Sequence, residues 1–474
     1  MSRESCVWSR VAGRRVLSRA LIGPRDSEFE TLGRTPDSGL PSRDFYNAPL
    51  MTTGNPARRP DGTQDILPQK MWAWRRVELA VREIFERYGY REVRTPLFEH
   101  TSLFNKATGE TTDIVEKEMF TVPSRAEGGE SFTFRPEFTP GVIRLILENQ
   151  LLQEKGLWKL WYLGPAFRYE RPQRGRFRQF HQFGVEAVGS SNPLLDVETM
   201  AVFAEILRAL GVQDYAIRIN SMGCANCRGG YRDALRAFIQ PHLAEYCGNC
   251  KRRFERNVLR VLDCKVPADR ARNDGAPATV DYLCAECKAH FTAVQAGLKD
   301  AGLVFAVDKH LVRGLDYYTR TVYEFSSKLL GAQDALGGGG RYDGLVGQMG
   351  GPDVGAVGFS AGVERVILAM REEGVEPKDR VTDFFAVAVD ADSQSGVFRA
   401  AQEFRAAGLK GDLDFEGRGV KAQMRSANKS GARYAVLIGA EERAQGRVRL
   451  KRMDGGEERV VPLDEAVRIL KGAV

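Results

Sequence analysis

The densest basic cluster of this 474-residue chain lies between two segments rich in aromatic and β-branched residues. Its five arginines are at positions 168, 171, 174, 176 and 178, and Glu170 is the one acid among them. A guanidinium group can donate two parallel hydrogen bonds to phosphate oxygens, so the cluster suits a triphosphate or a nucleic acid. A solvated basic turn would have the same composition, and the cluster alone leaves both interpretations open.

Two polar residues follow on the segment that returns from this cluster. Gln182 and Glu186 are four residues apart on an expected strand, so their side chains share one face. A carboxylate among apolar neighbours needs a partner, because burying an unpaired charge is costly. Either a structural arginine or a ligand with a cationic or N–H group would meet that need.

Two glycine-rich motifs exclude familiar enzyme classes. The segment Gly358–Gly362 matches the nucleophile elbow of α/β-hydrolases, but their catalytic histidine follows the serine, and every histidine here precedes Ser360. Close backbone approach where a strand meets a helix explains these glycines better, and Arg365 at the helix start could reach a phosphate.

The run Gly337–Gly340 lacks the Gly-Lys-Ser/Thr of a P-loop. It indicates tight backbone packing or ligand contact rather than a flexible linker.

The cysteines form a cluster of their own. Seven of the eight lie between residues 224 and 287, which favours reduced thiols in a cytosolic protein over scattered disulfides. Cys224-x₂-Cys227 and Cys247-x₂-Cys250 are separated by 19 residues, a spacing typical of a four-thiolate structural zinc site. Reduced thiols without a metal are the alternative. A second, less regular site would draw on Cys264, Cys284, Cys287 and His290.

A stripe of basic residues marks the C-terminal region. Its members recur every three or four residues without an acid between them, and they are Arg418, Lys421, Arg425, Lys429 and Arg433. This spacing predicts one face of a helix that ends near Gly431. A solvated face and a contact with a nucleic-acid backbone both fit the pattern.

Several elements are expected to position these residues. The apolar spacing predicts helices over 68–88 and 193–210, and a strand over 93–98 that Pro96 confines to an edge, a bulge or an interface. Segments 157–169 and 177–188 are predicted to pair as antiparallel strands. From residue 381 onward short strands alternate with helices, which predicts a compact α/β domain.

Composition sets the broad class of the molecule. Lys+Arg 69 and Asp+Glu 62 give a net charge of +7, and 43% of the residues are hydrophobic, which is typical of a globular protein with about three domains. No apolar run approaches the ~18 residues of a membrane span. Residues 1–50 are rich in Arg, Ser, Gly and Pro and are predicted to be a disordered extension, although an organelle leader remains an alternative.

In this order, the motifs resemble a bacterial-type histidyl-tRNA synthetase, a class II aminoacyl-tRNA synthetase, over residues 60–471. The first helix and the Pro96 strand resemble motif 1 of the class, Phe167–Gln182 motif 2, and Gly355–Arg365 motif 3. Leu311–Tyr318 and Gly338–Gly344 resemble the two segments specific to the histidine enzyme.

The resemblance implies an α/β (α+β) fold with an antiparallel-sheet catalytic core. The expected division is an N-terminal extension over 1–59, a catalytic core over 60–220 and 308–372, a cysteine-rich insertion domain over 221–307, and an anticodon-binding domain over 380–474. It also implies a cytoplasmic homodimer that uses L-histidine, ATP with Mg²⁺, and tRNA(His), without a membrane. The resemblance does not predict a bound zinc ion, because many members of the family lack the full set of cysteines.

Residue roles follow from the same resemblance. Arg313 and Arg168 would be catalytic, and ATP would be bound by Arg168, Arg176 and Arg365. Histidine would be bound by Glu137, Thr139, Gln182, Glu186, Tyr317 and Tyr318. Contacts with tRNA would come from Arg171, Gln173, Arg418, Lys421 and Arg425.

Two alternatives to a synthetase remain. A non-catalytic paralogue that regulates the first enzyme of histidine biosynthesis typically lacks the anticodon domain and departs from motif 2 and the specific segments, all of which are present here. A tRNA-binding module without ligase activity is the other.

Overall fold

The computed structural model describes residues 58–109, 112, 114–331, 334–376 and 382–472. The predicted N-terminal extension therefore lies outside the described residues, except for positions 58 and 59. Within the described ranges, no helix has the length and apolar character that crossing a membrane requires.

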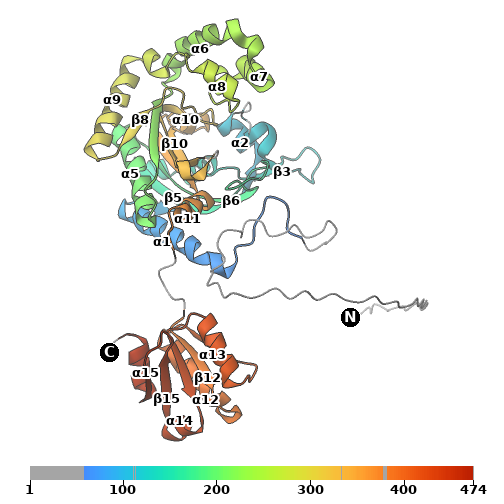
Figure 1. Cartoon of the computed structure of the whole chain (residues 1–474). Coiled ribbons are helices and arrows are strands. Elements are labelled where there is room, and N and C mark those ends of the chain that lie inside the picture. The colour runs from blue at the N-terminus through green and yellow to red at the C-terminus, as the bar shows by residue number, and fades with distance from the viewer. Residues whose placement is uncertain (1–57, 110–111, 113, 332–333, 377–381, 473–474) are drawn as a thin grey trace, which may run out of the picture. The chain divides into compact units, whose positions relative to one another are not determined.

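A large, mainly antiparallel sheet organises the described residues before position 377 (Figure 1). Its eight strands follow the order β1 (Arg91–Glu92), β5 (Trp158–Phe167), β6 (Gln179–Val188), β11 (Ala356–Gly362), β10 (Ala335–Arg341), β9 (Thr319–Ser326), β7 (Ala216–Ser221) and β8 (Phe305–Val307). Neighbouring strands are antiparallel, except that β1 is parallel to β5 and β8 is parallel to β7. This arrangement confirms the expected fold class.

The β5–β6 hairpin confirms the strand pair that the sequence predicted. Its register runs from Trp158 opposite Val188 to Phe167 opposite Gln179. Side chains alternate between the two faces of a strand. On β6, Phe183, Val185 and Ala187 therefore pack into one apolar core, while Gln182 and Glu186 face the other side.

Amphipathic helices cover both faces of this sheet. One core contains buried residues of α1 (Met71–Arg87), α5 (Pro193–Leu210), α9 (Ala285–Asp300) and α11 (Val363–Glu372). The other contains residues of α2 (Thr101–Thr108), α3 (Thr139–Glu148) and α10 (Leu345–Gln348), with α4 (Leu151–Glu154) packed against it.

Helix α5 has the bounds that its sequence predicts. The Asn192 side chain accepts a hydrogen bond from the Leu194 N–H, and Pro193 occupies the first turn, where its missing N–H costs nothing. Gly211 ends the helix with a φ of 84°, a conformation that glycine adopts without strain.

The single strand predicted over residues 93–98 is wrong. The structure has β1 before it and β2 (Phe98–His100) at its end, and β2 belongs to a separate sheet in the order β2, β4 (Phe132–Phe134), β3 (Phe120–Val122). Pro96 has no N–H for a strand ladder. The carbonyls of Thr95 and Pro96 instead accept hydrogen bonds from the Arg135 guanidinium at 2.9 and 3.2 Å, so a side chain replaces the neighbouring strand.

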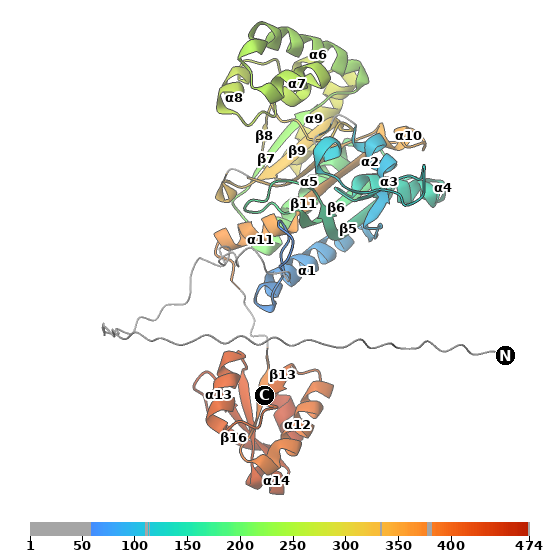
Figure 2. The ribbon, with the colours of Figure 1, turned by 90° about the vertical axis from the view of Figure 1, so that its right-hand side faces the viewer.

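Residues 221–307, which we call the cysteine-rich segment, are mainly helical. They contain α6 (Ala225–Ile239), α7 (Gly248–Arg256) and α8 (Pro267–Asn273), followed by α9 and β8. Helices α6, α7 and α8 lie side by side in both views (Figure 2). Leu235, Ile239, Phe254 and Val261 are buried among them.

The C-terminal residues form the α/β domain that their sequence predicts. Its sheet has the order β13 (Gly411–Leu413), β12 (Phe384–Ala388), β14 (Tyr434–Ile438), β15 (Arg447–Arg452) and β16 (Glu458–Pro462). The first three strands are parallel and the last two pairings are antiparallel. The helices are α12 (Gln394–Ala406), α13 (Val420–Lys429), α14 (Ala440–Gln445) and α15 (Leu463–Leu470).

Candidate functional site

A polar pocket opens on the face of the large sheet opposite α1 and α5. Its walls come from the start of α3, the β5–β6 connection, strands β10 and β11, the start of α11 and the segment before β9. The predicted residues that line it are Glu137, Thr139, Arg168, Arg176, Gln182, Arg313, Tyr317, Tyr318 and Arg365. The fold thus gathers residues separated by more than two hundred positions.

Glu186 lies beneath the pocket floor rather than on its surface, with 1% of its area exposed. The hydroxyls of Thr139 and Tyr162 donate to one carboxylate oxygen at 2.7 and 3.2 Å, and the Tyr342 hydroxyl donates to the other. Burial raises the pKa of Glu186 to about 8, against the lowering effect of these hydroxyls. Thr139 and Tyr342 line the pocket and so connect this carboxyl to any ligand within it.

Glu137 is a second buried carboxylate at the same end of the pocket. The Tyr317 hydroxyl donates to it at 2.7 Å and the Thr108 hydroxyl at 3.1 Å. Burial raises its pKa. Gln182 lies nearby on β6, and its side-chain oxygen is buried without a partner among the described residues. An unpaired buried acceptor is costly, so a ligand with N–H donors fits this end of the pocket.

The other end of the pocket is cationic. Arg168 donates from Nε to the Pro136 carbonyl at 2.9 Å, and Arg365 donates to the carbonyls of Gly175 and Ala335 at 3.2 and 2.7 Å. Burial, and then repulsion by the nearby Arg176, lower the pKa of Arg365. Three guanidinium groups that line one pocket favour a polyanionic ligand.

Arg313 enters the pocket from the segment before β9. Its Nη1 lies 3.0 Å from an oxygen of Glu324 on β9, which also pairs with Arg218 at 2.7 Å. An added Cβ at Gly338 would lie 2.7 Å from Arg313 Nη1. Any side chain at position 338 would therefore displace this guanidinium group, whereas glycine does not. The glycine run therefore serves close packing, as one of its two interpretations predicted.

Gly358 on β11 has a similar function beneath Glu186. The two residues are paired across β11 and β6, and an added Cβ at Gly358 would lie 2.0 Å from a carboxylate oxygen of Glu186. Gly358 thus allows close approach, as predicted for this motif, and does not build a nucleophile elbow.

The predicted tRNA contacts are surface residues outside this pocket. Arg171 and Gln173 are exposed in the β5–β6 connection. In the C-terminal domain, Lys421 and Arg425 lie on the exposed face of α13, whereas Gln423 and Ala427 are buried on its opposite face.

The basic stripe is shorter than its sequence suggests. Arg418 precedes α13 and pairs with the buried Asp414, and Arg433 follows the helix and pairs with Asp383 at 2.8 Å. Lys421, Arg425 and Lys429 remain as the helical part of the stripe.

The structure does not bring the two predicted cysteine pairs together. Cys224 and Cys227 lie with Cys284 and Cys287, whereas Cys247 and Cys250 lie with Cys264 and Asp269. His290 joins neither group, because its Nε2 is 3.3 Å from the buried Asp196. The expected combination is therefore wrong. Spacing along the chain could not reveal which pairs the helices between them bring into contact.

Several residues in contact with the site carry no signal of their own in the sequence. Tyr162 and Tyr342 donate to Glu186, Thr108 donates to Glu137, and Glu324 accepts from Arg313. Tyr342 lies in the segment Gly338–Gly344, and this position was the only sign in the sequence that it belongs to the site. The others are single polar residues on ordinary strands and helices.

Known proteins resemble the chain along most of its length. A family model for histidyl-tRNA synthetase matches residues 62–366, and one for an anticodon binding domain matches residues 385–473. The histidine–tRNA ligase of Moorella thermoacetica is 48% identical over 411 residues, which cover 86% of this chain and 96% of that protein. That of Thermotoga petrophila is 44% identical, with coverages of 86% and 97%.

A solved structure of the same kind of enzyme is also similar to this chain. The histidyl-tRNA synthetase of S. aureus superposes with a TM-score of 0.73 and 34% identity, and the match covers 87% of this chain and 99% of the other.

Proposed function

The chain belongs to the histidyl-tRNA synthetase family, and we propose that the pocket described above is where it activates histidine. It is an ATP-dependent histidine–tRNA ligase. Family membership does not assign roles to individual residues, so the proposed roles rest on the lining of the pocket. The observation that carries the proposal is the pairing of an acceptor-lined end with a cationic end in one pocket.

Histidine occupies the end lined by Glu137, Thr139 and Gln182. Its amino group donates to the Glu137 carboxylate and to the unpartnered Gln182 oxygen, which satisfies the buried acceptor. The imidazole lies against Tyr317 and Tyr318, where Tyr342 and Thr139 connect it to Glu186. A site built from acceptors aimed at N–H groups rejects amino acids whose side chains lack them.

ATP occupies the cationic end. Arg168 holds the α-phosphate, and Arg176 and Arg365 hold the outer phosphates. The histidine carboxylate attacks the α-phosphorus, a P–O bond forms, and the bond to pyrophosphate breaks. Arg313, between the two ends, neutralises the charge that develops on the α-phosphate and aligns the attacking carboxylate. No side-chain nucleophile is required.

Mg²⁺ is proposed as the companion of the triphosphate. In nucleotide sites this ion is held by one or two carboxylates together with phosphate oxygens. Glu170 lines the pocket beside Arg176, 2.7 Å from it, and offers such oxygen ligands. The ion supplies further charge neutralisation at the phosphates. Neither cysteine group lines the pocket.

The terminal ribose hydroxyl of tRNA(His) then attacks the carbonyl carbon of the adenylate, and AMP leaves. Arg171 and Gln173, which are exposed in the β5–β6 connection, meet the acceptor end in this proposal. The basic face of α13 meets the anticodon end through Lys421 and Arg425, and Arg418 adds a charge at its start.

We propose the domain division expected from the sequence: extension 1–59, core 60–220 and 308–372, insertion 221–307, and anticodon-binding domain 380–474. A cytoplasmic location and a homodimer are proposals of the same kind. Exposed apolar residues in and beside the β2–β4–β3 sheet support the dimer: Leu97, Phe98, Val122 and Phe132.

Histidine-dependent exchange of pyrophosphate into ATP tests the assignment. The purified chain is expected to catalyse exchange with histidine and with no other standard amino acid, and to charge tRNA(His). A regulatory paralogue or a tRNA-binding module would do neither, so absence of exchange would overturn the proposal.

A further inference from the structure

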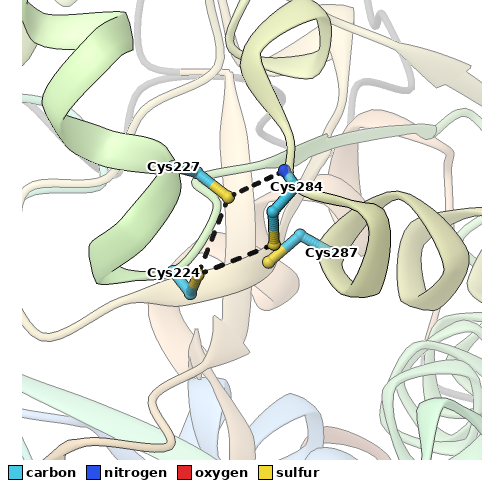
Figure 3. A group of neighbouring side chains, drawn as sticks. All are labelled: Cys224, Cys227, Cys284 and Cys287. Atoms are coloured by element: carbon cyan, nitrogen blue, oxygen red, sulfur yellow. Dashed lines mark hydrogen bonds between the residues drawn. The ribbon is translucent and has the colours of Figure 1, made fainter.

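Four cysteines from two distant segments meet at one point of the fold (Figure 3). Cys224 precedes α6 and Cys227 lies in its first turn, while Cys284 and Cys287 have the same positions at the start of α9. The sulfur atoms point toward one another, and all four lie within 4.8 Å of each other.

The distances between these sulfur atoms match those of a tetrahedral metal site. Four thiolates at ~2.3 Å from a zinc ion are about 3.8 Å apart. Cys224 Sγ lies 3.6 Å from Cys227 Sγ and 3.9 Å from Cys284 Sγ. A disulfide would need about 2.05 Å, and these cysteines are not bonded to one another.

The surroundings of the cluster also favour a metal. The Cys284 N–H donates to Cys227 Sγ at 3.1 Å, and such a bond stabilises a thiolate ligand. Cys227 and Cys287 are buried, with 4% and 0% of their area exposed. Packing alone does not require four small sulfur side chains to converge from the first turns of two helices, whereas a tetrahedral ion does.

We propose that Cys224, Cys227, Cys284 and Cys287 bind one structural Zn²⁺ ion at the point where the chain enters and leaves α6, α7 and α8. The ion crosslinks the two ends of a segment of about sixty residues. In the unfolded chain these thiols are far apart, so binding adds to the stability of the fold.

The site also supports the histidine end of the pocket. Gly223, beside Cys224, accepts a hydrogen bond from the Arg320 N–H at 2.9 Å, and Met222 N–H donates to the Arg320 carbonyl at 2.6 Å. Arg228, in the first turns of α6, donates to the carbonyl of Tyr318, which lines the pocket. An ion that fixes the start of α6 therefore fixes the backbone of residues 318–320.

We infer that a second group, Cys247, Cys250, Cys264 and Asp269, holds a second zinc ion. Cys247 precedes α7 and Cys250 lies in its first turn, and Cys247 Sγ is 3.9 Å from Cys264 Sγ. The Asp269 carboxylate is 3.3 Å from Cys264 Sγ and supplies the fourth ligand. Carboxylate oxygen is an accepted zinc ligand beside thiolates.

The metal content of the full chain tests both sites. Protein purified without added zinc or chelator is expected to contain about two equivalents by elemental mass spectrometry. The double variant Cys224→Ser/Cys284→Ser is expected to retain about one, and it is designed to fold because serine is a good residue for the helix start that each cysteine occupies. Cys247→Ser/Cys264→Ser is also expected to retain about one equivalent. Cys6→Ser, outside both groups, is the matched control and keeps the wild-type content.

Two further measurements distinguish the sites and separate them from catalysis. Cobalt-substituted protein is expected to show tetrahedral d–d bands, with weaker thiolate charge transfer once the four-cysteine site is removed. Loss of that site is expected to lower Tm and to raise KM for histidine several-fold while KM for ATP changes little. Less than half an equivalent in wild-type protein overturns both sites. Wild-type zinc content in one double variant overturns the site that it removes. The metal contents, the cobalt spectra and Tm are independent of the proposed ligase activity, and only the KM values depend on it.

Discussion

Arg313 is the residue on which the proposed chemistry depends most directly. It lines the pocket, and its guanidinium donates to Glu324 at 3.0 Å. Arg313→Ala is expected to leave the binding of ATP and histidine largely intact but to slow adenylate formation by roughly 10²-fold or more, because a positioned cation acts mainly on the transition state. Pyrophosphate exchange measures the rate, and equilibrium binding measures the affinities.

Arg218→Ala is the matched control for this variant. Arg218 pairs with the same Glu324 but does not line the pocket, so its loss removes a charge near Arg313 without removing the catalytic group. Undiminished exchange in Arg313→Ala, or an equal loss in Arg218→Ala, would contradict the role given to Arg313.

Glu186 makes the stability of the ligand-free protein depend on pH. Burial raises its pKa from 4.5 to about 8, so between these values the folded chain binds more protons than the unfolded chain. Stability therefore falls as pH rises through this window. Glu186→Gln removes the ionisation. The Tm of this variant minus that of the wild type is therefore expected to increase progressively from pH 4.5 to pH 8.

Thermal unfolding across this pH range checks the expectation. Glu127→Gln, which replaces an exposed carboxylate, is the control and should keep a constant offset from the wild type. A Glu186→Gln offset that is equally flat would show that Glu186 titrates normally.

At the scale of single residues, the sequence could predict a site residue only where the residue type itself indicated a ligand. Arginines, carboxylates and the specific segments pointed to Arg168, Glu137 and Arg313, all of which line the pocket. It could not reveal that Glu186 lies beneath the floor, because burial depends on which residues cover it. Tyr162 contacts Glu186 from the neighbouring strand, and nothing in its local sequence distinguishes it from a core tyrosine.

Strand β11 shows how an element is constrained by the site that it borders. Gly358 faces Glu186 across the β6–β11 pairing, and its added Cβ would also lie 2.4 Å from the Val185 carbonyl. Gly358→Ala is expected to destabilise the fold by about 1–3 kcal/mol and to weaken histidine binding. Gly347→Ala on α10, where an added Cβ meets nothing within 4 Å, should change neither. Chemical denaturation and histidine titration provide the two readouts, and wild-type histidine binding by Gly358→Ala would contradict the account.

Helix α13 is the second element with a function of its own. Lys421→Glu/Arg425→Glu is expected to reduce kcat/KM for tRNA charging by about 10-fold or more, because removed cations no longer release counterions from the tRNA backbone. Pyrophosphate exchange, which needs no tRNA, should be unchanged. Arg399→Glu, an exposed charge reversal on α12, is the control and should charge normally. If the α13 variant charges tRNA as efficiently as the wild type, this face does not contact tRNA.

Elements with strong local signals could be predicted, and those defined by distant contacts could not. Helix α5 carries its start and stop signals in Asn192, Pro193 and Gly211. The segment around Pro96 has strand-like composition, but a guanidinium 39 residues away takes the place of a strand partner. The cysteine groups depend in the same way on how α6 and α9 are brought together.

At the scale of the whole molecule, the pattern of exposed apolar residues predicts association. Phe98 is 52% exposed, packs against Phe132 at 5.8 Å between ring centroids, and lies in the sheet that also exposes Val122. Such a cluster on one small sheet is costly to leave in water and is typical of an interface. We therefore expect the purified chain to be a dimer through this sheet.

Phe98→Asp places a charge at the centre of the cluster and is expected to shift the chain toward monomer in analytical ultracentrifugation. Because the β2–β4–β3 sheet precedes Glu137 and the start of α3 at Thr139, the monomer is also expected to lose histidine-dependent exchange. Val304→Asp, at a position that is 89% exposed, controls for the effect of an added surface charge and should remain dimeric and active. A monomeric wild type would contradict the dimer, and a dimeric Phe98→Asp variant would place the interface elsewhere. Loss of activity without dissociation would instead indicate that the β2–β4–β3 sheet supports the pocket within one chain.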